Sequence, residues 1–304
     1  MFFDLPAAEE IMMEAEFAHR HEVHCSDRFL DNVYGTAAAA VGRRFESWET
    51  SGVFLKMSAA SIYIPKDNPE KPRGEDAHFI SMEDQTIGVA DGVGGWAKIG
   101  IDSGEYARQL MMNSFLALKK EPRFNVNPKR VLEEAFNNTT AQGSSTACII
   151  TLSGDKLRAV NVGDSGFLVI RNGEVVYQSP TQQRGFNCPY QLGSTKDNPS
   201  AAVEMEFRVE AGDVIVAGTD GLMDNMHASE IVESVRRRRR RRGMSEKENM
   251  MAEQACYMAN VALYNSFDRY AETPYSIASR KAGRCHRGGK VDDITVIIAR
   301  IIQD

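Results

Sequence analysis

This sequence repeatedly ends an apolar segment with an aspartate, which limits the folds open to it. The aspartates stand beside glycine or another acid in Val89-Ala90-Asp91-Gly92, Val162-Gly163-Asp164-Ser165, Thr219-Asp220-Gly221 and Val291-Asp292-Asp293. A single Asp-Gly pair is also a common turn. Several carboxylates at strand ends, however, repel one another unless cations lie between them, and oxygen ligands suit hard cations such as Mg²⁺ and Mn²⁺. The set of four therefore predicts a fold that gathers strand ends around cations.

The spacing of apolar residues changes along the chain from a helical period to a strand period. Helices are predicted from Ser103, expected to be an N-cap, and from Pro128. Strands are predicted over residues 85–90, 146–152, 157–162, 167–170, 174–178, 203–209, 213–219 and 295–302, with further helices over 228–235 and 246–263. Strands with helices grouped mostly at their ends indicate an α+β sandwich and not a βαβ repeat.

The regular pattern begins at about Phe54 and divides the chain in two. Residues 1–53 are expected to be an N-terminal extension, and residues 54–304 one folded domain. Seven consecutive arginines, Arg236–Arg242, form a basic insertion in this domain. Such a run can be a nuclear-localisation or polyanion-binding patch, or can recruit acidic substrates. We favour a solvated, self-repelling loop, because the surrounding domain is acidic.

Composition limits the classes of partner and compartment. The formal net charge of −6 does not favour nucleic acid, so none is expected as a partner. Five cysteines without paired spacing indicate reduced thiols and an intracellular, cytoplasmic protein. No apolar run approaches the roughly 20 residues of a membrane span, and the acids near the N-terminus do not suit a transit peptide. The dense group His19, His21, His24 and Cys25 lacks the second half of a usual zinc site.

Six motifs in a fixed order carry a family resemblance. They are Arg73-Gly74-Glu75-Asp76-Ala77-His78, Val89-Ala90-Asp91-Gly92-Val93-Gly94-Gly95-Trp96, Gly143-Ser144-Ser145-Thr146-Ala147, Asn161-Val162-Gly163-Asp164-Ser165-Gly166, Thr219-Asp220-Gly221-Leu222-Met223-Asp224-Asn225 and Asp292-Asp293-Ile294-Thr295-Val296. Over about residues 55–302 the chain resembles the type-2C (PPM) metal-dependent serine/threonine protein phosphatases. It is most similar to the T-cell-activation subgroup, whose best-known members are mitochondrial. The resemblance implies a four-layer α/β/β/α sandwich around a central pair of antiparallel sheets, and a mitochondrial location as the alternative to the cytoplasm.

The resemblance also implies the roles of the site residues. Asp91 corresponds to the carboxylate that bridges two Mg²⁺ or Mn²⁺ ions, and Gly92 to the residue whose carbonyl oxygen binds one of them. Asp220 and Asp292 correspond to ligands of the second ion. The remaining ligands implied are Glu75 and Asp76, through water, and Asp164 at an additional, weaker site. A water activated by the metals would hydrolyse phosphoserine or phosphothreonine in protein substrates, and a monomer is expected.

Two positions depart from the family pattern. Many relatives have a histidine, the proposed acid for the leaving group, where this chain has Val93. That role is left to Asp76 or to a water on the metal. Relatives also carry a phosphate-binding arginine four residues before the glutamate, where this chain has Lys71. Arg73 is the favoured replacement, because arginine binds phosphate as a two-pronged fork and lysine only as a point charge.

Two other classes of protein stay open at this point. One is a catalytically silent module that binds phosphorylated partners, which the presence of Val93 makes worth testing. The complete set Asp91, Asp220 and Asp292 argues against it. A nucleic-acid binder that uses the arginines would show a steep salt dependence, but it leaves the acidic set without a role. His78, next to the acidic pair, is expected to be structural.

Overall fold

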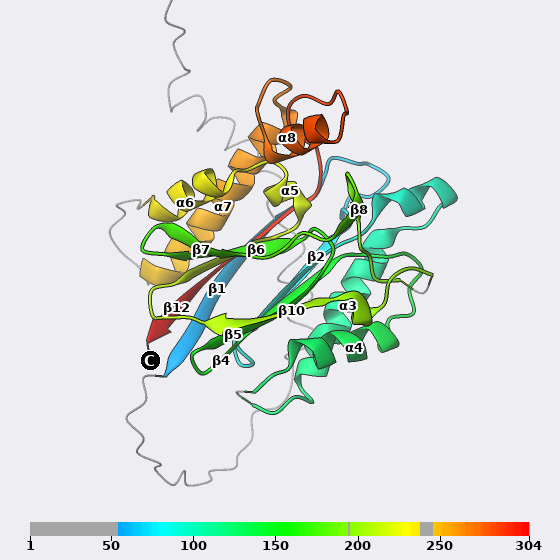
Figure 1. The fold of residues 1–304 in the computed structure, drawn as a ribbon. Coiled ribbons are helices and arrows are strands. Elements are labelled where there is room, and N and C mark those ends of the chain that lie inside the picture. The colour runs from blue at the N-terminus through cyan, green and yellow to red at the C-terminus, as the bar shows by residue number, and fades with distance from the viewer. Residues whose placement is uncertain (1–53, 124, 194, 238–245, 304) are drawn as a thin grey trace, which may run out of the picture. The chain divides into compact units, whose positions relative to one another are not determined.

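The computed structural model describes residues 54–123, 125–193, 195–237 and 246–303 (Figure 1). The predicted extension over residues 1–53 lies outside these ranges, and with it the group His19, His21, His24 and Cys25. Residues 238–242 of the arginine run also lie outside them. Among the described residues, no helix is both long and apolar enough to cross a membrane.

One sheet of the described chain has the strand order β1–β12–β11–β6–β7, and we call it the β12 sheet. Its strands are β1 Leu55–Ile64, β12 Ile294–Gln303, β11 Val214–Gly218, β6 Gly166–Arg171 and β7 Glu174–Gln178. All neighbours are antiparallel. β12 pairs with β1 on one side and with β11 on the other, so it lies inside the sheet. β6 and β7 form the hairpin predicted at Asn172-Gly173, where φ is 53° and 81°, as the favoured two-residue turns require.

The other large sheet has the order β10–β5–β4–β3–β2, and we call it the β3 sheet. Its strands are β10 Val203–Arg208, β5 Lys156–Val162, β4 Ala147–Ser153, β3 Thr86–Asp91 and β2 Asp76–Ser81. Again all neighbours are antiparallel. A small sheet, β8 Gln183–Gly185 with β9 Cys188–Pro189, lies in the connection between β7 and β10.

Helices cover the outer face of each large sheet (Figure 1). α3 Ser103–Leu118 and α4 Pro128–Asn138 pack on the β3 sheet through one buried apolar cluster. α6 Ala228–Arg236 and α7 Glu246–Phe267 pack on the β12 sheet through another. The described chain is completed by α5 Asp220–Met223, α8 Pro274–Lys281 and the short 3₁₀ helices Gly94–Ile99 and Pro199–Ala201. This is the predicted α/β/β/α sandwich, and the predicted fold class is confirmed.

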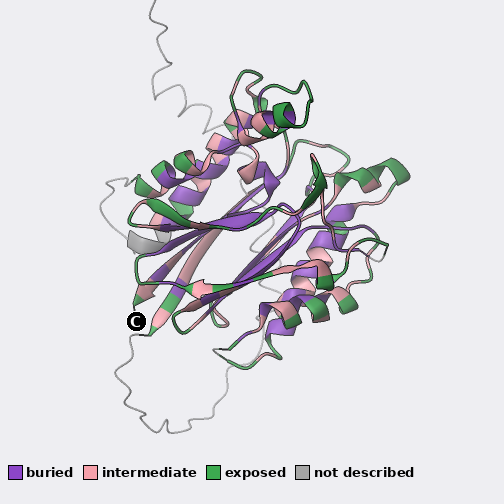
Figure 2. Cartoon of the chain, viewed as in Figure 1, coloured by how far each residue is buried: buried purple, intermediate pink, exposed green. Residues whose placement is uncertain are grey.

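The third apolar cluster lies between the two sheets. It holds Ile87 and Ile150 from the β3 sheet against Phe167, Ile215 and Ile297 from the β12 sheet, all at most 1% exposed. Figure 2 shows mostly purple strands in the middle of the sandwich, between helices that mix purple with pink and green. Because strand residues alternate between faces, the strands of the β12 sheet bury one row in this layer and the other row under α6 and α7.

Local predictions were mostly correct, with one wrong cap. Pro128 is the first residue of α4, as predicted, with Asn127 as its N-cap. Ser103 is not the N-cap of α3 but its first residue, because Asp102 accepts the capping hydrogen bond from the Gly104 amide at 3.0 Å. A carboxylate one residue earlier is the better acceptor for a helix N-terminus, since it also complements the helix dipole.

Candidate active site

Antiparallel pairing within each sheet, together with the packing of the two sheets, gathers the predicted aspartates at one edge of the sandwich. Asp91 ends β3 and lies directly opposite Asp76, which begins β2. Asp220 follows the end of β11, and Asp292 precedes the start of the neighbouring β12. In an antiparallel pair the end of one strand lies beside the start of the next. Segments far apart in sequence therefore place their carboxylates together.

A lysine ammonium joins two of these carboxylates. Lys290 Nζ makes a short ion pair with Asp220 Oδ2 and lies 2.9 Å from Asp292 Oδ2. It is also 3.3 Å from Oδ2 of Asp224, which stands one helical turn after Asp220 on α5. The side chain of Lys290 is only 16% exposed. Burial acts against its charged form, but the charges of Asp220, Asp292 and Asp224 outweigh this and raise the pKa of Lys290.

Asp76 is buried and has one unpaired oxygen. With it, the neighbouring acids form what we call the carboxylate cluster, namely Asp76, Asp91, Asp164, Asp220, Asp224 and Asp292. Asp76 Oδ2 accepts hydrogen bonds from the hydroxyls of Thr219 and Thr295, each at 2.7 Å. Its Oδ1 has no hydrogen-bond partner in the described structure. Burial, followed by the charge of Asp293, raises the pKa of Asp76 well above its usual range. The unpaired oxygen of a buried carboxyl marks a place where a cation or an ordered water is expected.

The pKa values of other carboxyls in the cluster are raised as well. Burial and the nearby charge of Asp220 raise the pKa of Asp91 well above its usual range. The same two causes raise the pKa of Asp164 to about 7 and that of Asp224 to about 8. Asp164 Oδ2 accepts from Gln183 at 2.8 Å, whereas its Oδ1 has no partner in the described structure. Without positive charge besides Lys290, these acids do not all ionise near neutral pH.

The Glu75 backbone holds Gly92 at the end of β3. The Gly92 amide donates to the Glu75 carbonyl at 3.0 Å. A side chain at Gly92 would meet the backbone oxygens of Ser103 at 2.6 Å and Glu75 at 2.7 Å, so this close approach needs glycine. Glu75 Oε1 itself accepts from Lys71 Nζ at 2.6 Å and from the Ser103 hydroxyl at 2.7 Å.

Asp293 fixes the loop that carries Lys71, Arg73 and Glu75. Its carboxylate accepts from the Tyr63 hydroxyl and the Lys66 amide, each at 2.9 Å, and from the Glu75 amide at 3.0 Å. Gly74 has φ 61°, and a side chain there would collide with Asp293 and Tyr63. Asp293 is thus a buried anchor between the start of β12 and this loop.

The two candidates for phosphate binding lie in different surroundings. The Lys71 ammonium is 15% exposed and pairs with Glu75, next to the carboxylate cluster. The Arg73 guanidinium is 61% exposed and lies 3.4 Å from Glu105 Oε2 on α3. The preference for Arg73 over Lys71 stays a prediction.

Two residues of this site were not assigned a role from the sequence. Asp224 stands four residues after Asp220, a spacing that places both on one face of a helical turn. Lys290 lies two residues before Asp292, and its backbone is fixed by Asn225, with 2.9 Å to the Asn225 Oδ1 and 2.8 Å to its Nδ2. The spacing of Asp224 is a usable signal. The position of Lys290 depends on a loop contact that no local pattern announces.

The chemistry of these side chains suits a hard divalent cation. The donors are all carboxylate oxygens, and those of Asp76 and Asp164 include unpaired buried atoms. Nevertheless, no three Asp, Glu, His or Cys side chains in the described ranges surround one point as ready ligands. The oxygens of Asp220 and Asp292 already bind Lys290, so a cation entering between them has to exchange with that ammonium.

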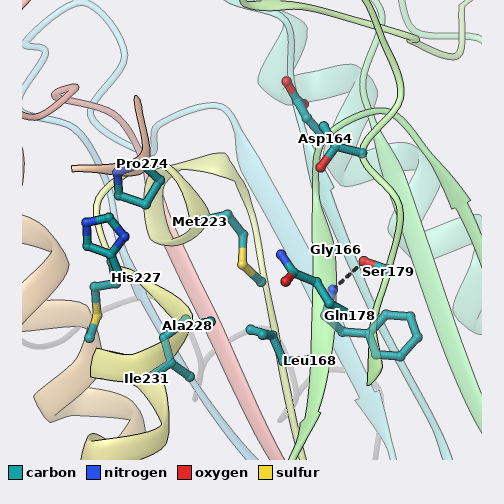
Figure 3. A pocket seen from close by; sticks show the side chains of 13 residues that line it. Asp164, Gly166, Leu168, Gln178, Ser179, Met223, His227, Ala228, Ile231 and Pro274 are labelled. Carbon is teal, nitrogen blue, oxygen red and sulfur yellow. Dashed lines mark hydrogen bonds between the residues drawn. The ribbon is translucent and has the colours of Figure 1, made fainter. Parts of the chain in front are cut away.

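A pocket of about 250 Å³ borders the cluster (Figure 3). It lies between β6–β7 and the segment from α5 to α6, with Asp164 at one end and Met223, His227 and Ile231 along its other side. Asp164 is the only acid among the described residues that line it. The pocket therefore adjoins the carboxylate cluster without containing it.

Known proteins with this pattern are phosphatases. Residues 86–302 match the sequence model of the family described as Stage II sporulation protein E (SpoIIE). The Arabidopsis thaliana protein described as "Probable protein phosphatase 2C 55" is 46% identical over 253 residues, which are 81% of this chain and 52% of that protein. The chain thus spans about half the length of this relative.

Solved structures agree with the sequence comparison. The X-ray structure of the photosystem II phosphatase PBCP matches with a TM-score of 0.72 and 32% identity, over 80% of this chain and 98% of that one. The catalytic domain of the serine/threonine protein phosphatase PstP, in complex with 2 manganese ions, shares the fold with a TM-score of 0.56 at 19% identity, over 82% of this chain and 100% of that one. This chain belongs to the type-2C (PPM) protein phosphatase family. Its predicted place in the T-cell-activation subgroup stays a prediction.

Proposed function

We propose that residues 54–304 form a metal-dependent phosphatase that hydrolyses phosphoserine and phosphothreonine in proteins. The observation that carries this proposal is the convergence of buried and half-buried carboxylates from separate stretches of chain at one sandwich edge. Burial and mutual repulsion raise the pKa values of Asp91 and Asp292, so the cluster is under-supplied with positive charge. Membership of the phosphatase family supports the same conclusion.

Two Mg²⁺ or Mn²⁺ ions are the proposed cofactors. Asp91, the Gly92 carbonyl, Asp220 and Asp292 would hold them, while Glu75 and Asp76 would act through water and Asp164 at a third, weaker site. When bound, the ions would supply an activated water and neutralise charge on the phosphoryl oxygens. The 2 manganese ions bound by PstP support the choice of metal.

The chain's own cations would orient the phosphate. Lys71, paired with Glu75 beside the cluster, offers a point charge. The Arg73 side chain is 61% exposed and pairs with Glu105 at 3.4 Å, so its guanidinium can turn towards a substrate and bind two phosphate oxygens. We propose that Arg73 is the main phosphate-binding residue and that Lys71 assists it.

Asp76 is the proposed proton donor to the leaving hydroxyl. Val93 has no proton to give, although its backbone amide holds the site by donating to the Ser144 carbonyl at 2.9 Å. Burial, and then the charge of Asp293, raise the pKa of Asp76, which favours a protonated carboxyl. The Oδ1 of Asp76, which has no hydrogen-bond partner in the described structure, is the oxygen that would carry this proton.

The test is dephosphorylation of phosphoserine and phosphothreonine peptides by the full chain with Mn²⁺. We expect Asp220→Ala to lower kcat/KM more than about a hundredfold, because losing a metal ligand exceeds the roughly 10–100-fold effect of losing a ligand's partner. Asp155→Ala is the matched control: Asp155 is exposed and pairs with Arg208, and both lie outside the cluster. This variant should stay within about twofold of the unmodified chain.

Other outcomes identify the competing function. Phosphopeptide binding without hydrolysis at any Mn²⁺ or Mg²⁺ concentration would make the chain a silent binding module, as Val93 allows. Hydrolysis that persists in the Asp220→Ala protein or with a chelator would contradict the metal-dependent assignment.

A further inference from the structure

We infer that Lys290 is a built-in cation of the carboxylate cluster, which divalent ions must displace, and that it thereby lowers the affinity of the site for them. This inference rests on the proposed metal site and adds the residue that sets its affinity. It concerns binding, so its test does not depend on phosphatase activity.

The contacts of Lys290 place its charge among the proposed ligands. Its ammonium binds Asp220 Oδ2 and, at 2.9 Å, Asp292 Oδ2, the oxygens of two carboxylates that the second cation would use. Asp224 Oδ2, at 3.3 Å, is a third partner. Oxygens that accept from an ammonium have fewer lone pairs for a metal, and the two cations repel each other across a few ångströms.

The backbone of Lys290 is held in place, whereas its side chain can move. Asn225 bonds both the amide and the carbonyl of Lys290, so the residue cannot leave as a whole. The four-carbon stem of a lysine is flexible, however. Asp224 and the Tyr275 ring, whose centre is 5.7 Å from Nζ, flank the ammonium, and the side chain is 16% exposed, so a displaced ammonium has a route past them to solvent.

The ammonium also compensates part of the mutual repulsion among these carboxylates. The part-buried Lys290 lies within reach of three acids and compensates part of their negative charge. A site held together in this way is pre-assembled, but a metal gains only the difference between its own attraction and that of the lysine.

The test is calorimetric titration of chelator-treated full chain with Mn²⁺, with the Asp220→Ala protein giving the background from other sites. We expect Lys290→Met to tighten Mn²⁺ binding about tenfold or more, because a repelling charge is removed. The same change should lower the melting temperature of the metal-free protein. Lys66→Met is the matched control: Lys66 Nζ lies 3.8 Å from the same Asp292, but it is 44% exposed and screened by solvent, so its loss should change the Kd less than about twofold.

A second measurement uses the unmodified chain and does not depend on the variant folding. Labelling with an amine-reactive acylating reagent, read by mass spectrometry, should increase at Lys290 when saturating Mg²⁺ is added, with Lys66 as internal reference. Unchanged or weaker Mn²⁺ binding by Lys290→Met, or no increase in Lys290 labelling, would overturn the inference while leaving the proposed function intact. Failure of both proteins to bind Mn²⁺ above background would overturn the metal site itself.

Discussion

His78 shows how burial at a single residue sets a pH response. Its Nε2 lies 3.0 Å from the Ser61 hydroxyl, and its ring meets the Tyr63 ring edge-on. Burial lowers the pKa of His78 from 6.5 to about 4. The neutral ring is therefore the form that suits the folded protein, in keeping with its predicted structural role.

We predict that His78 makes the folded protein less stable as pH falls. The unfolded chain takes up a proton near pH 6.5 and the folded chain only near pH 4. This contribution is complete above pH 6.5 and is lost as pH falls towards 4, by about 2 kcal/mol at pH 4.5. The measurement is urea unfolding of the unmodified chain and His78→Gln at pH 7 and pH 4.5. The stability gap between the two proteins should shrink by this amount, and a constant gap would show that His78 does not titrate in this way.

Among single residues, the sequence indicated the positions of the clustered aspartates but not that of Lys290. Asp91, Asp164, Asp220 and Asp292 stand at or beside strand ends, so pairing within a sheet could be expected to bring neighbours together, whereas the meeting of the two sheets depends on their packing. Lys290 could not be placed, because its position depends on Asn225, 65 residues away. Asp293 could not be recognised as an anchor either, because Tyr63, Lys66 and Glu75 reach it only in the folded protein.

The layer between the sheets is a feature of the element scale that contributes to stability. Ile215 of β11 is completely buried there and pairs with Val169 of β6 and Ala299 of β12. Both faces of β11 are covered, since Val216 packs into the cluster under α6 and α7. A cavity left by a smaller side chain on this strand is therefore closed off from solvent, and water does not fill it.

We predict that Ile215→Ala lowers the free energy of unfolding by about 2–5 kcal/mol, because it leaves a cavity in a layer that cannot collapse. The control is Val176→Ala on β7, whose side chain is 51% exposed, and it should cost less than about 0.5 kcal/mol. Denaturant unfolding of both variants measures this. Equal effects would mean that the inter-sheet layer adjusts around the missing side chain.

Most strands and long helices were predicted from their period, but the strands β1 and β2 and the one-turn helix α5 were not. The strands and the two helices over 228–235 and 246–263 agree with β4 to β7, β10 to β12, α6 and α7 within a few residues. α5 is one turn long and carries no period. α8 is also short, yet it had a usable signal: Thr273 caps it by accepting from Ser276, and Pro274 stands at its first position.

For the molecule as a whole, charge is unevenly distributed along the chain. The net charge is −6, although seven arginines follow one another. The first two have partners: Arg236 donates to the Gly173 carbonyl at 2.9 Å, and the Arg237 guanidinium lies 4.4 Å from the centre of the Tyr257 ring. These contacts tie the start of the run to the hairpin and to α7.

We predict that replacing Arg238–Arg242 with serine leaves both the free energy of unfolding and the preference between acidic and neutral phosphopeptides unchanged, as for a solvated loop. The measurement is kcat/KM for matched peptides at low and high salt, with the unmodified chain as control. A selective loss of activity on the acidic peptide, largest at low salt, would instead assign substrate recruitment to the run.

The place of β12 inside its sheet has a consequence for synthesis. A ribosome makes residues 294–303 after every other described strand, yet β1 and β11 can be joined only through them. Until they emerge, β1 has no partner in its sheet and Asp292 cannot stand beside Asp220. The β12 sheet and the placement of Asp292 beside Asp220 are therefore completed only when the last described strand has been made.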